Sequence, residues 1–103
     1  MDKIAGLREI LAQDPNNAFA RYGLAVELAE NGDTESAIAE FDQLLASHPA
    51  YTSGYFMCAQ TLAKAGRTDE AMTRLKSGIE SAKRDGNSHA MSNMQAFLDE
   101  LER

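Results

Sequence analysis

The sequence predicts an all-α fold built from stacked helical hairpins, and three observations support this expectation. First, the only two prolines, Pro15 and Pro49, are separated by the same 34-residue interval as the glycines Gly32 and Gly66. Second, apolar residues recur three and four positions apart, which is the spacing of one helix face. Third, no segment alternates apolar and polar residues as a half-buried strand does. A repeated pair of helices accounts for all three observations.

The first three helices are expected over residues 2–13, 18–31 and 34–47. The first carries leucines whose equivalents recur one 34-residue interval later, so we interpret it as the second helix of a preceding, incomplete pair. Pro15 separates it from the next helix, because a proline steers the residue before it away from helix. The second and third helices carry apolar stripes at helical spacing, made of Ala18, Leu24, Ala25 and Leu28, then Ala37, Ile38, Phe41, Leu44 and Leu45.

The last three helices are expected over residues 52–65, 68–84 and 88–102. The first two copy the preceding pair at the same interval, with matches that include Ala25/Ala59, Leu28/Leu62, Ala37/Ala71 and Leu45/Ile79. Lys83 stands where the second pair would have its proline, so the helix over 68–84 is expected to run longer. The final helix carries one apolar stripe, made of Met91, Met94, Phe97, Leu98 and Leu101.

Glycines mark the short breaks within each pair. Gly32 and Gly66 occupy positions where a left-handed residue ends one helix. Asp33 and Thr68 are then expected to cap the following helices through their side chains. Gly78 falls inside a helix instead, where it is expected to weaken that helix by about 1 kcal/mol relative to alanine.

Composition narrows the classes of function. A chain of 103 residues supports one domain, and a net charge of −6 disfavours nucleic acid and anionic membranes, because both attract positive proteins. The single Cys58 cannot form an internal disulfide, which fits a reducing compartment. No apolar run approaches the roughly 20 residues of a membrane span. The first residues also lack the basic-then-apolar order of a secretion signal, so we expect a cytoplasmic protein without a nucleic-acid or membrane partner.

The residues at the repeated positions resemble the tetratricopeptide repeat (TPR). The matching residues are Leu24, Ala25, Leu28, Gly32, Ala37, Phe41 and Pro49, then Tyr55, Cys58, Ala59, Leu62, Gly66, Ala71 and Leu75. Residues 65–71 are similar to the family's turn almost residue for residue. Arg21 departs from the pattern, because the family usually has a bulky aromatic residue there.

The resemblance covers nearly the whole chain and implies a TPR-like, right-handed solenoid of helical hairpins. It implies a single domain over 1–103 with an N-terminal half-repeat helix in 1–15, full repeats at 18–51 and 52–85, and a C-terminal capping helix at 88–102. Two full repeats with a flanking helix at each end just supply the roughly three repeats that stability requires.

By the resemblance, the first helix of each repeat lines a concave groove that holds a partner. The groove positions are then Phe19, Tyr22, Val26 and Ala29 in the first repeat and Ser53, Phe56, Gln60 and Lys64 in the second. Tyr22 and Phe56 are equivalent positions of the two repeats and are expected to stack side by side as an anchor for an extended or helical protein segment. The alternative is that the chain's own last helix covers both rings. The charged set with which some family members hold C-terminal carboxylates is not present, so chaperone tails are not expected.

The leading interpretation is a non-catalytic protein–protein interaction module, or adaptor, for a protein or peptide partner. A self-associating homodimeric scaffold, in which the groove or the end helix packs on a second copy, is the main alternative. Residues 1–50 hold nine acids and three bases, whereas residues 51–103 hold seven of each, so an acidic front could meet a basic back. Ordinary solvated helix faces account for the same charges. A small helical enzyme and a plain helical bundle also stay open. No cofactor, catalytic residue or metal ligand is expected: His48 and His89 have no histidine or cysteine at ligand spacing, and Cys58 falls on a buried stripe.

Overall fold

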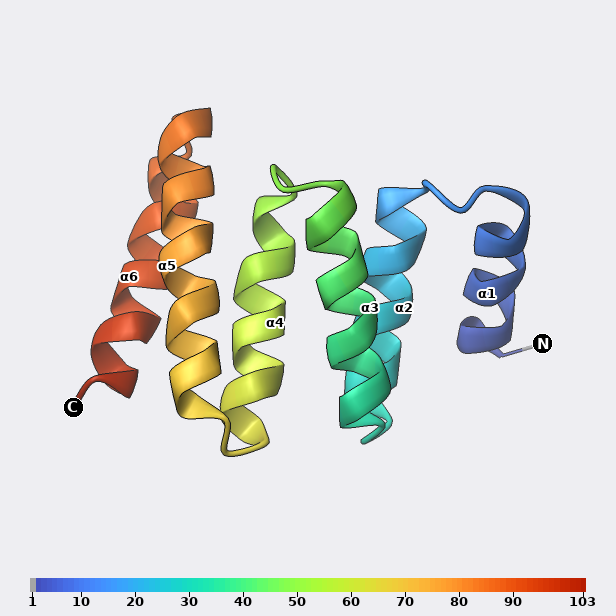
Figure 1. Ribbon diagram of the computed structural model, residues 1–103, viewed down its shortest axis with the longest axis horizontal. Coiled ribbons are helices and arrows are strands. Elements are labelled where there is room, and N and C mark those ends of the chain that lie inside the picture. The colour runs from blue at the N-terminus through green and yellow to red at the C-terminus, as the bar shows by residue number, and fades with distance from the viewer. Residues whose placement is uncertain (1) are drawn as a thin grey trace.

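Six α-helices in a row make up the computed structural model, which describes residues 2–103 (Figure 1). They are α1 (Lys3–Gln13), α2 (Ala18–Glu30), α3 (Thr34–Ser47), α4 (Thr52–Lys64), α5 (Thr68–Asp85) and α6 (Ser88–Leu101). Each end lies within one residue of the sequence expectation, and no strand occurs in the described part of the chain. Met1, which the expected half-repeat 1–15 includes, lies outside the described residues. The all-α helical repeat fold is therefore confirmed.

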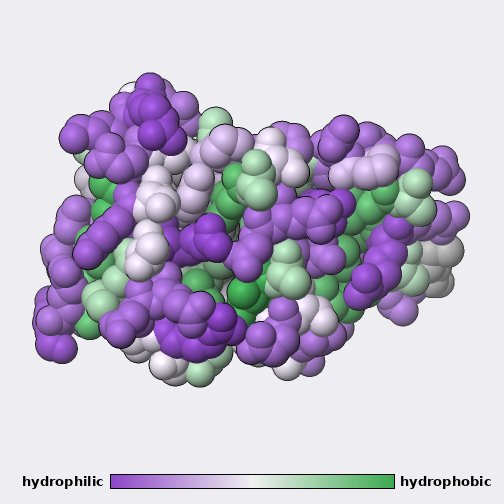
Figure 2. All heavy atoms as spheres, viewed as in Figure 1, coloured by the Kyte–Doolittle hydropathy of each residue, from purple (hydrophilic) through white to green (hydrophobic). Residues whose placement is uncertain are grey.

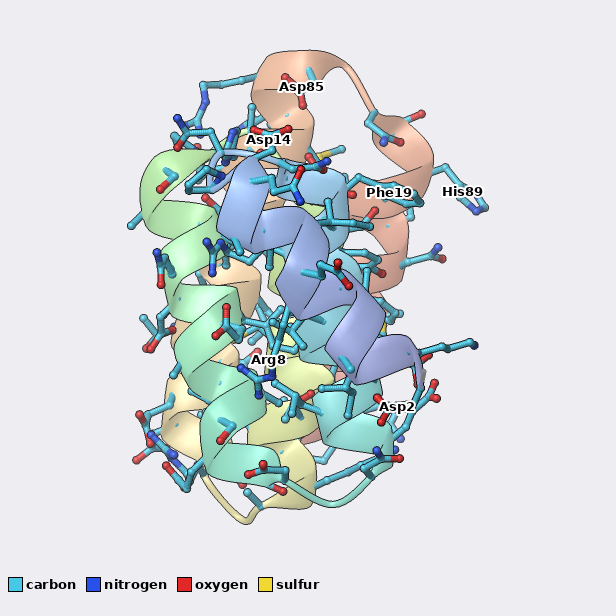
Figure 3. The ribbon with its side chains drawn as sticks, turned by 90° about the vertical axis from the view of Figure 1, so that its right-hand side faces the viewer. Asp2, Arg8, Asp14, Phe19, Asp85 and His89 are labelled. Carbon is cyan, nitrogen blue, oxygen red and sulfur yellow. The ribbon has the colours of Figure 1, made fainter. Side chains whose placement is uncertain are left out.

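The helices are arranged in two layers. Each helix packs mainly on its neighbours in sequence, and smaller contacts join α2 to α4 and α4 to α6. Seen from the α1 end, α3 and α6 lie on opposite sides of the molecule (Figure 3). The two termini lie at opposite ends of the row (Figure 1). The helices α2, α4 and α6 therefore share one face, and α3 and α5 share the other.

The turns within the two hairpins have the same hydrogen bonds. Gly32 has φ +83° and Gly66 has φ +80°, so both adopt the left-handed conformation that ends a helix. The amide after each glycine donates to the carbonyl five residues upstream at 2.9 Å, from Asp33 to Leu28 and from Arg67 to Leu62. The expected glycine turns are confirmed, and the two hairpins have the same structure at this turn.

The expected side-chain caps are wrong. Asp33 occupies the N-cap position of α3, but its side chain makes no capping hydrogen bond. The N-cap of α5 is Arg67, and Thr68 is already the first helical residue. Because the glycine turn already holds the chain in place through backbone hydrogen bonds, these two helices begin without a side-chain cap.

The core alternates small and large side chains. Five alanines are fully buried where helices pack against one another: Ala25, Ala37, Ala59, Ala71 and Ala82. The largest buried side chains fill the spaces between them: Leu24, Phe41, Leu44, Leu75 and Met94. Because one hairpin cannot bury its apolar face alone, the neighbouring hairpins complete this core.

Arg21 replaces an aromatic residue but keeps its hydrogen bond. In the second hairpin, the hydroxyl of Tyr55 donates to the carbonyl of Pro49 at 2.7 Å. In the first, the guanidinium of Arg21 donates to the carbonyl of Pro15 at 3.1 Å, and Pro15 is the equivalent of Pro49 in the preceding repeat unit. Arg21 also forms an ion pair with Glu40 of α3 at 2.6 Å, so the charge is compensated where the side chain is half-buried.

Packing requires glycine at position 78, although alanine has the higher intrinsic helix propensity. Gly78 is buried in α5, and a Cβ atom built there would lie 2.6 Å from Cβ of Tyr55 and 2.6 Å from Sδ of Met94. Such contacts are too short for any real Cβ atom. Gly78 therefore allows α5 to approach both α4 and α6 closely.

The expected extension of α5 is confirmed, because the helix continues to Asp85. The added turn, residues 82–85, brings Asp85 to the start of α4, where the Thr52 hydroxyl donates to it at 3.4 Å. The Thr52 hydroxyl also lies 3.2 Å from the hydroxyl of Ser81. Gly86, with φ +68°, then ends the helix and turns the chain back into α6.

Candidate functional site

The residues expected in the groove lie on the face that α2, α4 and α6 share. Phe19 is 77% exposed in the first turn of α2, whereas Tyr22 and Val26 are half-buried further along that helix. On α4, Phe56 and Gln60 are half-buried, and Ser53 and Lys64 are exposed.

An open cavity of about 260 Å³ lies between these three helices. Tyr22 contributes from α2, while Thr52, Ser53, Phe56 and Met57 contribute from α4. The other wall comes from α6 and the residue before it, with Asn87, His89, Ala90, Asn93 and Met94. The last helix therefore forms one wall of the hollow and leaves it open. We call this hollow the aromatic cavity.

A second hollow of about 160 Å³ continues from the aromatic cavity along α2 and α4. Its lining residues are Val26, Ala29, Glu30, Thr34, Met57, Gln60, Thr61 and Lys64. Met57 lines both hollows, so they adjoin. We call the two together the trough. It contains every residue of the expected groove except Phe19, which stands one helical turn before Tyr22.

Instead of stacking on each other, Tyr22 and Phe56 form three ring pairs with other aromatic residues. Tyr22 lies 5.3 Å from Tyr51 and 6.4 Å edge-on from the buried Phe41, measured between ring centroids. Phe56 packs edge-on against Phe97 of α6 at 5.9 Å. Each ring thus has an aromatic partner from another element, and both rings still line the aromatic cavity. These contacts hold the two side chains in fixed orientations.

The residues that α6 contributes to the trough are not predicted by the sequence. His89 and Asn93 are outside the expected set, and Met94 is expected only as part of an apolar stripe. Their contribution depends on how closely α6 approaches α4, which in turn depends on the glycine at position 78. The length of α5 is the one sequence feature that could have indicated this contribution from α6. Its extra turn shifts the start of α6 relative to the 34-residue spacing.

The aromatic cavity presents apolar surface and uncharged polar groups. Its lining includes hydroxyls and amides, and His89 is the only ionisable side chain besides Tyr22 that the described residues contribute to it. Burial raises the pKa of the Tyr22 hydroxyl above its usual value, and the neighbouring Tyr51 raises it further. Tyr22 therefore stays neutral at physiological pH. Such a cavity suits an uncharged apolar side chain with hydrogen-bonding groups around it.

Within the described residues, the cysteine is unreactive and no cluster of metal ligands occurs. Cys58 is fully buried, and desolvation raises its pKa to about 11, so its thiol is not ionised at neutral pH. Across residues 2–103, no three His, Cys, Asp or Glu side chains come together as a metal site. In the same range, no helix is both long and apolar enough to cross a bilayer.

The opposite face, formed by α3 and α5, is mainly hydrophilic, with smaller hydrophobic areas between the hydrophilic residues (Figure 2). Arg67 bridges Glu35 at 3.1 Å and Glu70 at 2.6 Å, and Arg74 pairs with Asp42. The hydrogen bond from Arg67 lowers the pKa of Glu70. The pairs of Arg67 with Glu35 and of Arg74 with Asp42 link α5 and the residue before it to α3 in the preceding hairpin.

Comparisons with known proteins agree with this architecture. A family model described as tetratricopeptide repeat matches residues 4–49 and again residues 28–93. A TPR repeat-containing protein of Pseudomonas aeruginosa is 29% identical over 100 residues, which cover 97% of this chain and 95% of that protein. Among solved structures, a tetratricopeptide repeat domain protein of Salinibacter ruber has a TM-score of 0.81 and 30% identity, over 85% of this chain and 89% of that one. A protein of Bordetella parapertussis has a TM-score of 0.85 and 25% identity, over 100% of this chain and 90% of that one.

Proposed function

Because the chain belongs to the tetratricopeptide repeat family, we propose that it is a non-catalytic interaction module whose trough binds a segment of another protein. Proteins of this family generally bind other proteins and are generally not catalysts. We further propose a single domain with full repeats at 18–51 and 52–85, and a cytoplasmic location, in keeping with the single buried Cys58.

The open trough is the observation that carries this proposal. Its floor is apolar and aromatic, and Tyr22 and Phe56 are each held in place by another ring. An aromatic or aliphatic side chain of the partner would enter the aromatic cavity as the anchor. Ser53 and Gln60 would add hydrogen bonds at the rim, and Lys64 would add a charge at the far end. Fixed rings lose little entropy on binding, which favours this use.

A selected peptide ligand provides the test. Peptides selected from a displayed random library are added to isotopically labelled protein, and the amide chemical shifts are followed. We expect the ligands to carry an apolar anchor and to shift residues of α2, α4 and α6. Ligands that shift only the α3 and α5 face would overturn the proposal.

Matched substitutions sharpen this test. Ser53→Arg places a long charged side chain at the rim of the aromatic cavity, whereas Ser77→Arg places the same side chain on exposed surface of α5 on the opposite face. We expect only Ser53→Arg to abolish peptide binding. The double variant Tyr22→Ala with Phe56→Ala should also lose binding, and circular dichroism must show that its helices remain.

Self-association is the second candidate function, and one observation favours it. Phe19 is a large apolar side chain on the face that carries the trough, and it is the more exposed of the two large exposed hydrophobic residues in the described part of the chain, the other being Ile10.

A further inference from the structure

Phe19 projects into solvent from the face that carries the trough. It is 77% exposed in the first turn of α2, one turn before Tyr22, which lines the aromatic cavity. Residues three apart lie on the same side of a helix, so Phe19 stands beside the opening of that cavity. In Figure 3, Phe19 and the cavity residue His89 project from the same side of the molecule. One face thus carries both an apolar protrusion and an apolar hollow.

The hollow can accept a phenyl ring. An apolar cavity of about 150 Å³ is enough to bind benzene, and the aromatic cavity measures about 260 Å³. Phe56, Met57 and Met94 offer the ring-edge and thioether contacts that aromatic side chains favour. The phenyl ring of Phe19 is therefore a chemical and steric match for the cavity beside it. In its own chain the ring does not line this cavity and projects into solvent from α2.

Electrostatics single out this face for contact between identical chains. The net charge of −6 makes two copies repel each other over most approaches. Within residues 2–103, no Asp, Glu, Lys or Arg lines the aromatic cavity, so contact there brings no like charges directly together. Glu30 and Lys64, which carry opposite charges, lie together further along the trough. The molecule extends 41 × 29 Å across this face, which leaves room for the roughly 800 Å² per partner that a stable dimer buries.

We propose that the protein forms a two-fold symmetric dimer in which Phe19 of each copy inserts into the aromatic cavity of the other. A two-fold axis between Phe19 and the cavity brings each protrusion onto the other hollow, so the contact is self-complementary and closed. This inference rests on the proposed function, because it uses the same trough. The dimer covers the aromatic cavity, so a peptide with an apolar anchor competes with the second copy.

Sedimentation equilibrium over a micromolar to millimolar concentration series tests the dimer. For the wild-type chain we expect the weight-average mass to rise from 11.2 kDa toward twice that value. Phe19→Ala should weaken association at least about 30-fold, the loss typical of a central anchor residue. Ile10→Ala is the matched control, because Ile10 is 47% exposed on α1, which does not line the trough. We expect that variant to associate like the wild type.

A second readout locates the contact. In a mixture of labelled and unlabelled protein, intermolecular nuclear Overhauser effects should join the Phe19 ring to the methyl groups of Met57 and Met94. A wild-type chain that stays at 11.2 kDa at every concentration overturns the dimer. A dimer that persists in Phe19→Ala also overturns it, because the contact must then use another surface.

Failure of this inference is distinguishable from failure of the proposed function. If the protein is strictly monomeric but still binds selected peptides in the trough, only the dimer proposal is refuted. If the protein dimerises through Phe19 but no peptide ligand is found, even with the monomeric Phe19→Ala variant, binding of other proteins is refuted and the dimer stands.

Discussion

Replacing Gly78 with alanine tests the packing that positions α6 against the trough. Helix propensity alone predicts that Gly78→Ala stabilises the protein, because alanine is favoured over glycine inside a helix by about 1 kcal/mol. The structure predicts the opposite sign. The new Cβ atom would lie 2.6 Å from Cβ of Tyr55 and from Sδ of Met94.

The magnitude follows from which atoms can move. Met94 can change its side-chain conformation, whereas Cβ of Tyr55 is fixed to the backbone of α4 and moves only with that helix. Adding a methyl group to a packed core costs about 1–3 kcal/mol, and the rigid neighbour places Gly78→Ala in the upper part of that range. After subtraction of the helix-propensity term, we expect a net loss of about 1–2 kcal/mol of unfolding free energy.

Urea unfolding at equilibrium measures this loss, and Gly23→Ala is the matched control. Gly23 also lies inside a helix, α2, but a Cβ atom there would meet the terminal carbons of Leu7 at 3.4 and 3.6 Å, which is ordinary contact. Gly23→Ala should therefore leave the protein as stable or stabilise it by up to about 1 kcal/mol. If Gly78→Ala proves as stable as the wild type, the close approach of α5 to α4 is not as described.

Three further predictions concern other parts of the fold. Gly66→Val should cost at least about 1 kcal/mol, because a β-branched residue resists the φ of +80° at that turn, and an unchanged melting temperature would count against it. Arg21→Ala should cost about 1–3 kcal/mol in urea unfolding, because it leaves Glu40 half-buried without its partner; an unfolding midpoint equal to that of the wild type would contradict this account. Stability should fall as the pH rises from about 9 to about 11, because the Cys58 thiol ionises near pH 9 in the unfolded chain, whereas burial raises its pKa to about 11 in the folded chain. Below pH 9 both states hold the proton and this contribution is constant, so Cys58→Ala should lack that part of the slope in a pH series.

The repeat spacing makes most of the fold predictable from the sequence. Pro15, Pro49, Gly32 and Gly66 mark the breaks because proline and glycine act through the backbone, independently of what packs nearby. The start of α5 is predicted correctly, but its cap is not: Thr68 is a good capping residue in isolation, and the backbone hydrogen bonds of the glycine turn make that role unnecessary.

The site is less predictable, because it depends on distances between helices. Nothing in the local sequence shows that Gly78 faces Tyr55 and Met94 at once. The aromatic partners of Tyr22 and Phe56 also come from other elements. The equivalent positions of Tyr22 and Phe56 in the two repeats therefore suggest that the rings are neighbours but do not determine their orientations. Arg21 is a further case that the pattern does not predict. It stands where the family usually has an aromatic residue, yet it makes the equivalent hydrogen bond, to the carbonyl of Pro15.

The central claim is that α2, α4 and α6 enclose an open cavity that accepts an apolar side chain. Methyl resonances of the methionines test it directly, because Met57 and Met94 line the aromatic cavity and Met72, on α5, does not. N-acetylphenylalaninamide, an uncharged single-residue probe, is titrated into the Phe19→Ala variant so that no second copy competes. We predict saturable ring-current shifts of the Met57 and Met94 methyl groups with Met72 unchanged. Shifts that are absent, or equal at all three methionines, would contradict the account.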